Sequence, residues 1–177
     1  MLKNLNPLAF TPLPAKALRS EGWLLRQLQI QAAGQAGNLD KYWADVKDSG
    51  WIGGNAESWE RAPYWLDGFV PLAYLLRDDD MIKRANYYID YILTHQQEDG
   101  WICPEKDKYT YDMWALFIIL KVLVQYYHFT DDSRVEPAVT KALLNIDRRL
   151  DIMHTLFAWG NPRGFYPCFI SANPSFL

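Results

Sequence analysis

The sequence predicts an all-α protein, built as an incomplete α/α toroid of helical hairpins with a period of about 50 residues. Three observations support this fold class. Mostly apolar segments alternate with amphipathic ones, acidic turns separate them, and the tripeptide Gly-Trp-Ile at residues 50–52 recurs at residues 100–102. In a double ring of helices, the inner helices are covered on both sides and the outer helices on one side only, so this alternation is typical of a toroid.

The first half of the chain holds one separate helix and the start of a hairpin. After a proline-containing segment, a helix starts with Ser20 as its N-cap and ends at residues 34–37, which include two glycines. A second helix begins near Pro63 and runs to Leu76. It is apolar nearly all round, which predicts burial, and Pro71 should bend it or move its start later.

The second half continues the alternation. Three helices follow: an amphipathic one over residues 82–93, a mostly apolar one over residues 112–129 and an amphipathic one over residues 133–153. The acidic turn at residues 78–80 offers helix caps, and Ser133 with Glu136 forms a capping-box pattern. Three histidines stand near predicted helix ends, where they interact with the helix dipole: His95, His128 and His154.

The composition argues against several classes of function. The 177 residues carry a formal net charge of −3 with no basic stripe, which argues against a nucleic-acid partner. No polybasic patch or long apolar span indicates a membrane partner, and the N-terminus lacks the features of a signal peptide, so a cytoplasmic location is the default expectation. The two cysteines have no CxxC spacing, so no metal site is predicted.

Several long motifs, in matching order and spacing, carry a resemblance to a known family. They include residues 10–28, GWIGGNAESWERAPYWLDG at residues 50–68, PLAYLL at residues 71–76 and QEDGW at residues 97–101. With these motifs, residues 8–164 resemble the β-L-arabinofuranosidase-type enzymes, glycoside hydrolase family 127 and its relatives. The resemblance implies an (α/α)6 barrel that hydrolyses glycosidic bonds in arabinose-containing glycans.

The resemblance also implies a catalytic centre that we do not find in this sequence. In the family, a cysteine thiolate is the nucleophile, a zinc ion is held by cysteines and a glutamate, and another glutamate is the acid/base. Those motifs lie farther along the family's chain, and neither Cys103 nor Cys168 stands in a matching one. We therefore assign no catalytic residue, metal ligand or cofactor to this chain, and we expect no hydrolysis by it alone.

The end of the sequence departs from the repeat. A third hairpin should open near Trp159, but prolines at positions 162, 167 and 174 exclude a long helix there. The sequence thus divides into residues 1–164, the first part of a glycosidase-like barrel, and a non-family tail over residues 165–177. A closed ring of six hairpins needs roughly 300 residues. Apolar surface of the inner helices is therefore expected to be exposed and open to self-association.

Eight residues are candidate contacts for the carbohydrate substrate that the resemblance implies. All are aromatic or polar, and they lie in loops or in the first part of a predicted helix: Trp51, Asn55, Glu57, Trp59, Asp67, Trp101, Glu105 and Asp112. Trp51 and Trp101 occupy equivalent positions at the start of two loops. Their rings either stack on a sugar or pack the rim of the fold.

The carboxylates among these candidates leave alternatives open. Glu57 and Glu60 have i, i+3 spacing; they are either an acid/base pair or a brace for the helix start, and we expect the brace. Asp67 lies among apolar residues, so it either forms a structural ion pair or points into the central cavity. Glu105 and Asp112 lie close enough to the next inner helix to share that cavity.

Two other functions remain open. A non-catalytic helical scaffold or binding module would use the same hairpins without any chemistry. A terpene-cyclase-like toroid is suggested by residues 97–101, which faintly resemble the Gln…Gly-Trp repeats of those proteins. The acidic run at residues 78–80 lies in an outer turn and lacks the flanks that such an enzyme needs, so this alternative is weaker.

Overall fold

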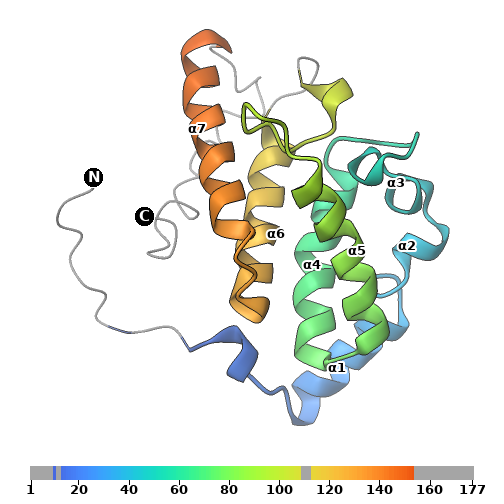
Figure 1. The fold of residues 1–177 in the computed structure, drawn as a ribbon. Coiled ribbons are helices and arrows are strands. Elements are labelled where there is room, and N and C mark those ends of the chain that lie inside the picture. Colours follow the sequence, from blue (N-terminus) through green and yellow to red (C-terminus); the bar gives the residue numbers. More distant parts are fainter. Residues whose placement is uncertain (1–9, 11–12, 109–112, 154–177) are drawn as a thin grey trace.

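The structure is a computed structural model that describes residues 10, 13–108 and 113–153, and the regular elements within these ranges are all helices (Figure 1). The longer helices are α1 (Gly22–Ala33), α4 (Arg61–Leu76), α5 (Asp79–Thr94), α6 (Trp114–Thr130) and α7 (Val135–Met153). The shorter ones are η1 (Ala15–Ala17), α2 (Leu39–Tyr42), α3 (Ala44–Lys47), η2 (Gly50–Ile52) and η3 (Glu105–Asp107). The predicted all-α class is confirmed.

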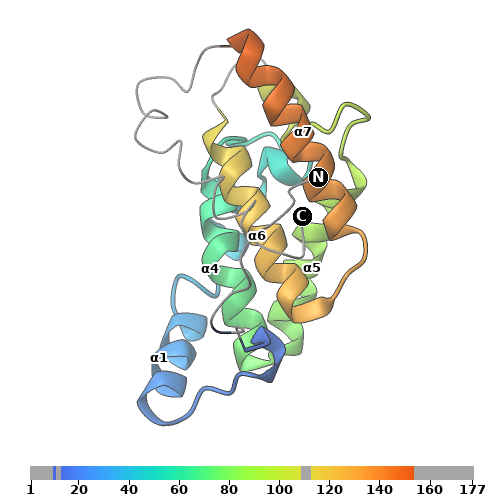
Figure 2. The same ribbon diagram turned by 90° about the vertical axis from the view of Figure 1, so that its left-hand side faces the viewer.

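Two hairpins, α4–α5 and α6–α7, form the body of the fold. Helix α4 packs against α6 and α5, and α6 packs against α7. Figure 2 shows α4 and α6 on one side of this body and α5 and α7 on the other. All residues from Trp114 to Leu120 of α6 are buried, whereas α5 and α7 each keep an exposed polar face. The predicted alternation of buried and amphipathic helices is therefore present, and closure into a toroid stays a prediction.

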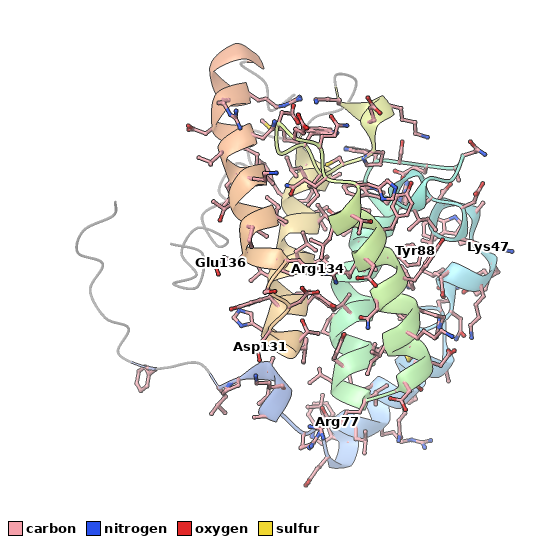
Figure 3. All side chains as sticks on the ribbon, viewed as in Figure 1. Lys47, Arg77, Tyr88, Asp131, Arg134 and Glu136 are labelled. Carbon is pink, nitrogen blue, oxygen red and sulfur yellow. The ribbon has the colours of Figure 1, made fainter. Side chains whose placement is uncertain are left out.

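The two inner helices end in the same way. Each ends on a non-glycine residue in the left-handed region, Arg77 with φ 58° and Asp131 with φ 54°, and these residues lie at the same end of the molecule (Figure 3). The next residue is an aspartate whose carboxylate accepts a backbone N–H at or just before the start of the following helix, and Asp78 is the N-cap of α5. Asp78 accepts a hydrogen bond from the Met81 N–H at 2.9 Å, and Asp132 accepts one from the Arg134 N–H at 3.0 Å.

Three details of the helix ends differ from the prediction. At the start of α7, the carboxylate that binds the backbone is Asp132, one residue before the predicted Ser133. Helix α1 has Glu21 rather than Ser20 as its N-cap. Helix α4 starts at Arg61 and continues through Pro71, so this proline does not delay its start. A proline costs one backbone hydrogen bond, and the packing of a buried helix outweighs that loss.

Helix α1 is held by its C-terminal end. The Asn38 side-chain amide donates to the carbonyl groups of Ala32, Ala33 and Gly34 at 3.1, 3.3 and 2.8 Å, which satisfies acceptors that a helix end leaves open. No residue of α1 is buried, and Trp23 is 78 % exposed. In the described part of the chain, no helix combines the length and the apolar character needed to cross a membrane.

The Asp78 cap gives a first test of the fold. Replacement of Asp78 by alanine removes the acceptor for the Met81 N–H, and we expect the free energy of unfolding to fall by about 1 kcal/mol. The control is Asp79→Ala at the next exposed position, which loses only a helix-dipole interaction of about 0.3 kcal/mol. Urea unfolding measures both variants, and equal losses would contradict the capping role.

Candidate functional site

The two Gly-Trp loops share a hydrogen bond to the tryptophan N–H, although their backbones differ: residues 50–52 form a 3-10 turn, and Gly100 has a φ of 94°. In the first loop, the Trp51 N–H donates to the Ser49 hydroxyl oxygen at 3.3 Å. In the second loop, the Trp101 N–H donates to a carboxylate oxygen of Asp99 at 3.0 Å. In both loops the acceptor is the side chain two residues before the tryptophan. The repeat seen in the sequence therefore extends to this one hydrogen bond, but not to the backbone conformation.

Both loop tryptophans are buried. Trp51 and Trp101 are each 2 % exposed, and their indole N–H groups donate to the carbonyl oxygens of Trp59 at 2.8 Å and Pro104 at 3.2 Å. The guanidinium of Arg149 lies over the Trp101 ring, 4.5 Å from its centroid. In this structure the two rings therefore pack the loops, which is the second of the two alternatives considered for them.

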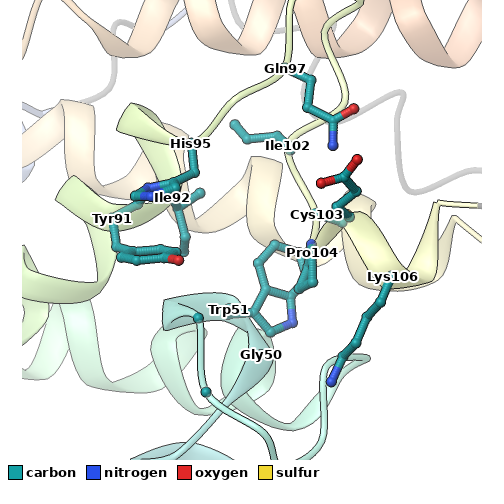
Figure 4. Close-up of a pocket in the computed structure, with 13 residues that line it drawn as sticks. Gly50, Trp51, Tyr91, Ile92, His95, Gln97, Ile102, Cys103, Pro104 and Lys106 are labelled. Carbon is teal, nitrogen blue, oxygen red and sulfur yellow. The ribbon is translucent and has the colours of Figure 1, made fainter.

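A pocket of about 580 Å³ lies between the two loops and the C-terminal end of α5 (Figure 4). Residues from three segments line this loop pocket: 50–54, 91–97 and 102–106. Gly53 allows the first loop to come close to α5, because it has a φ of 78° and a side chain there would collide with the Tyr91 hydroxyl. Of the predicted contacts, Trp51 and Glu105 line this pocket.

A stacked pair of rings forms one wall of the loop pocket. The Tyr91 and His95 rings are parallel to within 10°, with centroids 3.8 Å apart. His95 is the C-cap of α5, and its Nδ1 lies 2.8 Å from the carbonyl oxygen of Tyr91. The predicted position of His95 and His128 near helix ends is confirmed, and His154 lies outside the described residues.

Polar side chains surround the mouth of the loop pocket. Glu105 and Lys106 are exposed, and the Lys106 ammonium donates to the Ala56 carbonyl oxygen at 3.3 Å. Gln97 is half-buried, and its Oε1 accepts a hydrogen bond from the Lys108 ammonium at 2.6 Å. The mouth therefore combines both charge signs with a neutral amide.

A charged network fixes the second Gly-Trp loop. Lys108 pairs with Asp99 at 2.7 Å, and Arg149 of α7 lies 3.9 Å from the same carboxylate oxygen. Burial pushes the pKa of Asp99 upward, but the Lys108 and Trp101 hydrogen bonds and the charges of Lys108 and Arg149 outweigh this effect and lower it. The network holds the loop segment around Asp99 against α7.

Asp67 lies in a second polar region, between the inner helices. Its Oδ2 pairs with the Lys121 ammonium at 2.9 Å, which links α4 to α6. Its Oδ1 is buried and has no hydrogen-bond partner among the described residues. Asp67 is not among the residues that line the loop pocket, so the structure does not bring it together with Glu105. Asp112, the third carboxylate expected there, lies outside the described residues.

Glu57 braces the start of α4. Its carboxylate accepts hydrogen bonds from the backbone N–H groups of Glu60 at 3.0 Å and Arg61 at 3.2 Å. Burial nevertheless raises the pKa of Glu57, because desolvation outweighs these hydrogen bonds. Asn55 is exposed, and Trp59 is half-buried with its carbonyl oxygen bound to Trp51. The main chain of Glu57 and Trp59 thus holds the first loop, through the Ser49 hydroxyl and the Trp51 indole.

The zinc ion that the resemblance implies for full-length family members does not fit the described residues. A protein zinc site needs three or four converging ligands. Within residues 13–108 and 113–153, no three His, Cys, Asp or Glu side chains gather in this way. Cys103 is buried in the wall of the loop pocket, and Cys168 lies outside the described residues. We derive no chemical step through zinc.

No family model, curated protein or solved structure matches this chain.

The pocket wall includes residues that the sequence did not single out as ligand contacts. Tyr91, His95 and Gln97 follow one another along one helix end, directly before the second Gly-Trp loop. The aromatic–histidine spacing of four residues was the available signal, because i, i+4 side chains meet on a helix face. Their role as a pocket wall depends on the first loop, which is distant in sequence.

Replacement of Trp51 by phenylalanine tests whether this ring packs the loop. The change leaves the Trp59 carbonyl oxygen without its indole donor and creates a small cavity, so we expect a loss of about 2–3 kcal/mol in the free energy of unfolding. The matched control is Trp23→Phe on the exposed face of α1, expected to change stability by less than about 0.5 kcal/mol. Chemical denaturation measures both variants, and a similar loss of unfolding free energy in Trp51→Phe and Trp23→Phe would contradict the packing role.

Replacement of Asp99 by asparagine tests the charged network. Because the folded-state pKa of Asp99 is lowered, its contribution is present above the unfolded-state pKa, about 4, and is lost as the pH falls through the folded value. Asp99 is partly exposed, so we expect the free energy of unfolding of the wild type to exceed that of the variant by less than about 1 kcal/mol at pH 7. This difference should shrink below about pH 4. Urea titrations across pH measure this, and a pH-independent difference would contradict it.

Proposed function

We propose that this chain is a glycosidase-like protein of carbohydrate metabolism and that its loop pocket binds an L-arabinofuranose-type sugar. The observation that carries the proposal is the position of the pocket, between the two Gly-Trp loops that repeat in the sequence and share a hydrogen bond to the tryptophan N–H. Loops on one rim of a helical scaffold are a common place for binding residues. The motif resemblance around residues 50–68 supports a sugar of this type.

The chemistry of the loop pocket supports a neutral polar ligand. Tyr91 and His95 provide flat, partly apolar surface, while Gln97, Glu105 and Lys106 provide hydrogen-bonding groups. A pocket with apolar walls and a few placed polar groups is typical of small-molecule sites. The adjacent opposite charges of Glu105 and Lys106 favour neither an anionic nor a cationic ligand.

We assign binding, and not bond cleavage, to the described residues. The resemblance supports hydrolysis of β-L-arabinofuranosides as the activity of the family, but no described residue matches its nucleophile. Glu57 serves the start of α4, and Asp67 pairs with Lys121. Turnover of an aryl β-L-arabinofuranoside that disappears in Glu57→Gln would contradict this assignment.

A helical scaffold or binding module is the second candidate function. Helix α1 favours it, because Trp23, Leu24 and Ile30 are 78, 45 and 52 % exposed. Self-association through inner-helix surface stays a prediction, and light scattering after size-exclusion chromatography tests it. The terpene-cyclase alternative loses support, since Asp78 caps α5 and Asp80 pairs with Arg84 at 2.9 Å.

Isothermal titration of methyl β-L-arabinofuranoside into the full chain tests the proposed function. We expect saturable binding that weakens about tenfold in Glu105→Gln, because a charge-assisted hydrogen bond is replaced by a weaker neutral one. Glu98→Gln is the control, since Glu98 is exposed and lies between two of the lining segments but does not line the pocket. Absence of saturable binding in the wild type, or equal effects of the two variants, would contradict the proposal.

A further inference from the structure

The loop pocket has two residues, close in sequence, whose hydrogen-bonding polarity is fixed by contacts with other groups of the protein. They are His95 and Gln97, which follow the last residue of α5. Resting on the proposed function, we infer that these two residues determine specificity: His95 Nε2 accepts from one sugar hydroxyl and Gln97 Nε2 donates to another. The ligand is therefore a neutral sugar with at least two free hydroxyl groups.

The orientation of His95 leaves Nε2 as its acceptor. A carbonyl oxygen can only accept, so the 2.8 Å contact with the Tyr91 carbonyl places a proton on Nδ1. The Thr94 hydroxyl donates to the Asp90 carbonyl oxygen at 2.7 Å, so its contact with Nδ1 at 3.2 Å fits the same proton position. In a neutral imidazole with a proton on Nδ1, Nε2 is an acceptor. Stacking on Tyr91 holds the ring in place.

The orientation of Gln97 leaves its amide nitrogen as a donor. An ammonium group can only donate, so the atom 2.6 Å from Lys108 Nζ must be the amide oxygen. Lys108 is itself held by its ion pair with Asp99 at 2.7 Å. Figure 4 shows the Gln97 amide nitrogen turned toward the pocket. The pocket therefore has a fixed donor close in sequence to a fixed acceptor.

This combination selects hydroxyl groups over charged ones. A hydroxyl both donates and accepts, so it satisfies either residue. A carboxylate or phosphate has no proton for His95 Nε2, and an ammonium has no lone pair for Gln97 Nε2. Sites that hydrogen-bond a hydroxyl also discriminate against analogues that lack it, because their own polar groups then lose their partners.

The test compares two ligands and two variants at pH 8. Gln97→Glu turns the donor into an acceptor and keeps the contact with Lys108, while His95→Phe removes the acceptor and keeps a ring against Tyr91. We measure dissociation constants for methyl β-L-arabinofuranoside and its 2-deoxy analogue by ligand-observed NMR. Wild type should prefer the intact sugar about 3- to 10-fold, the magnitude of one hydrogen bond, and each variant should lose about that much affinity for it.

The outcomes separate this inference from the proposed function. Glu98→Gln is the control, and circular dichroism confirms that each variant is folded. If the wild type binds neither ligand, the proposed function fails. If the wild type binds both equally, or if Gln97→Glu and His95→Phe bind the intact sugar as tightly as Glu98→Gln does, the specificity role is overturned while the pocket remains a sugar site. A preference that disappears in both variants supports the role.

Discussion

Each Gly-Trp loop has to bury a large ring and at the same time provide a partner for the indole N–H, and the positions of the surrounding segments follow from this requirement. The Trp51 indole donates to the carbonyl of Trp59, so the chain between them must form a loop that returns to the ring. The Trp101 indole reaches Pro104, which shapes the segment before α6. The loop pocket is the space that remains between these two anchored loops and α5.

The polar residues serve two separate regions. On the inner helices, Asp67 and Lys121 join α4 to α6, so this pair contributes to helix packing. At the loop rim, Asp99 and Lys108 hold the second loop and, through Lys108, orient Gln97. The same ion pair thus links the stability of the second loop to the orientation of a residue that lines the pocket.

Most of the fold could be predicted from the sequence, because apolar periodicity and the repeated Gly-Trp motif are local signals. The observed first residues of the helices differ from the predicted ones by only a few positions; α4, for example, begins at Arg61 and not near Pro63. The site was less predictable, since ring burial depends on distant partners: Arg149 of α7 covers Trp101. The pocket wall at Tyr91 likewise depends on the approach of Gly53, which helix periodicity does not reveal.

The central claim is that the sugar binds between the two Gly-Trp loops, and amide chemical-shift mapping with methyl β-L-arabinofuranoside tests it most directly. Titration of the isotope-labelled chain should shift the backbone amides of Gly53, His95 and Glu105, which belong to the three segments that line the pocket. The amides of Asp67 and Lys121 on the inner helices should stay in place. Shifts centred on that inner pair, or no saturable shifts at all, would contradict the account.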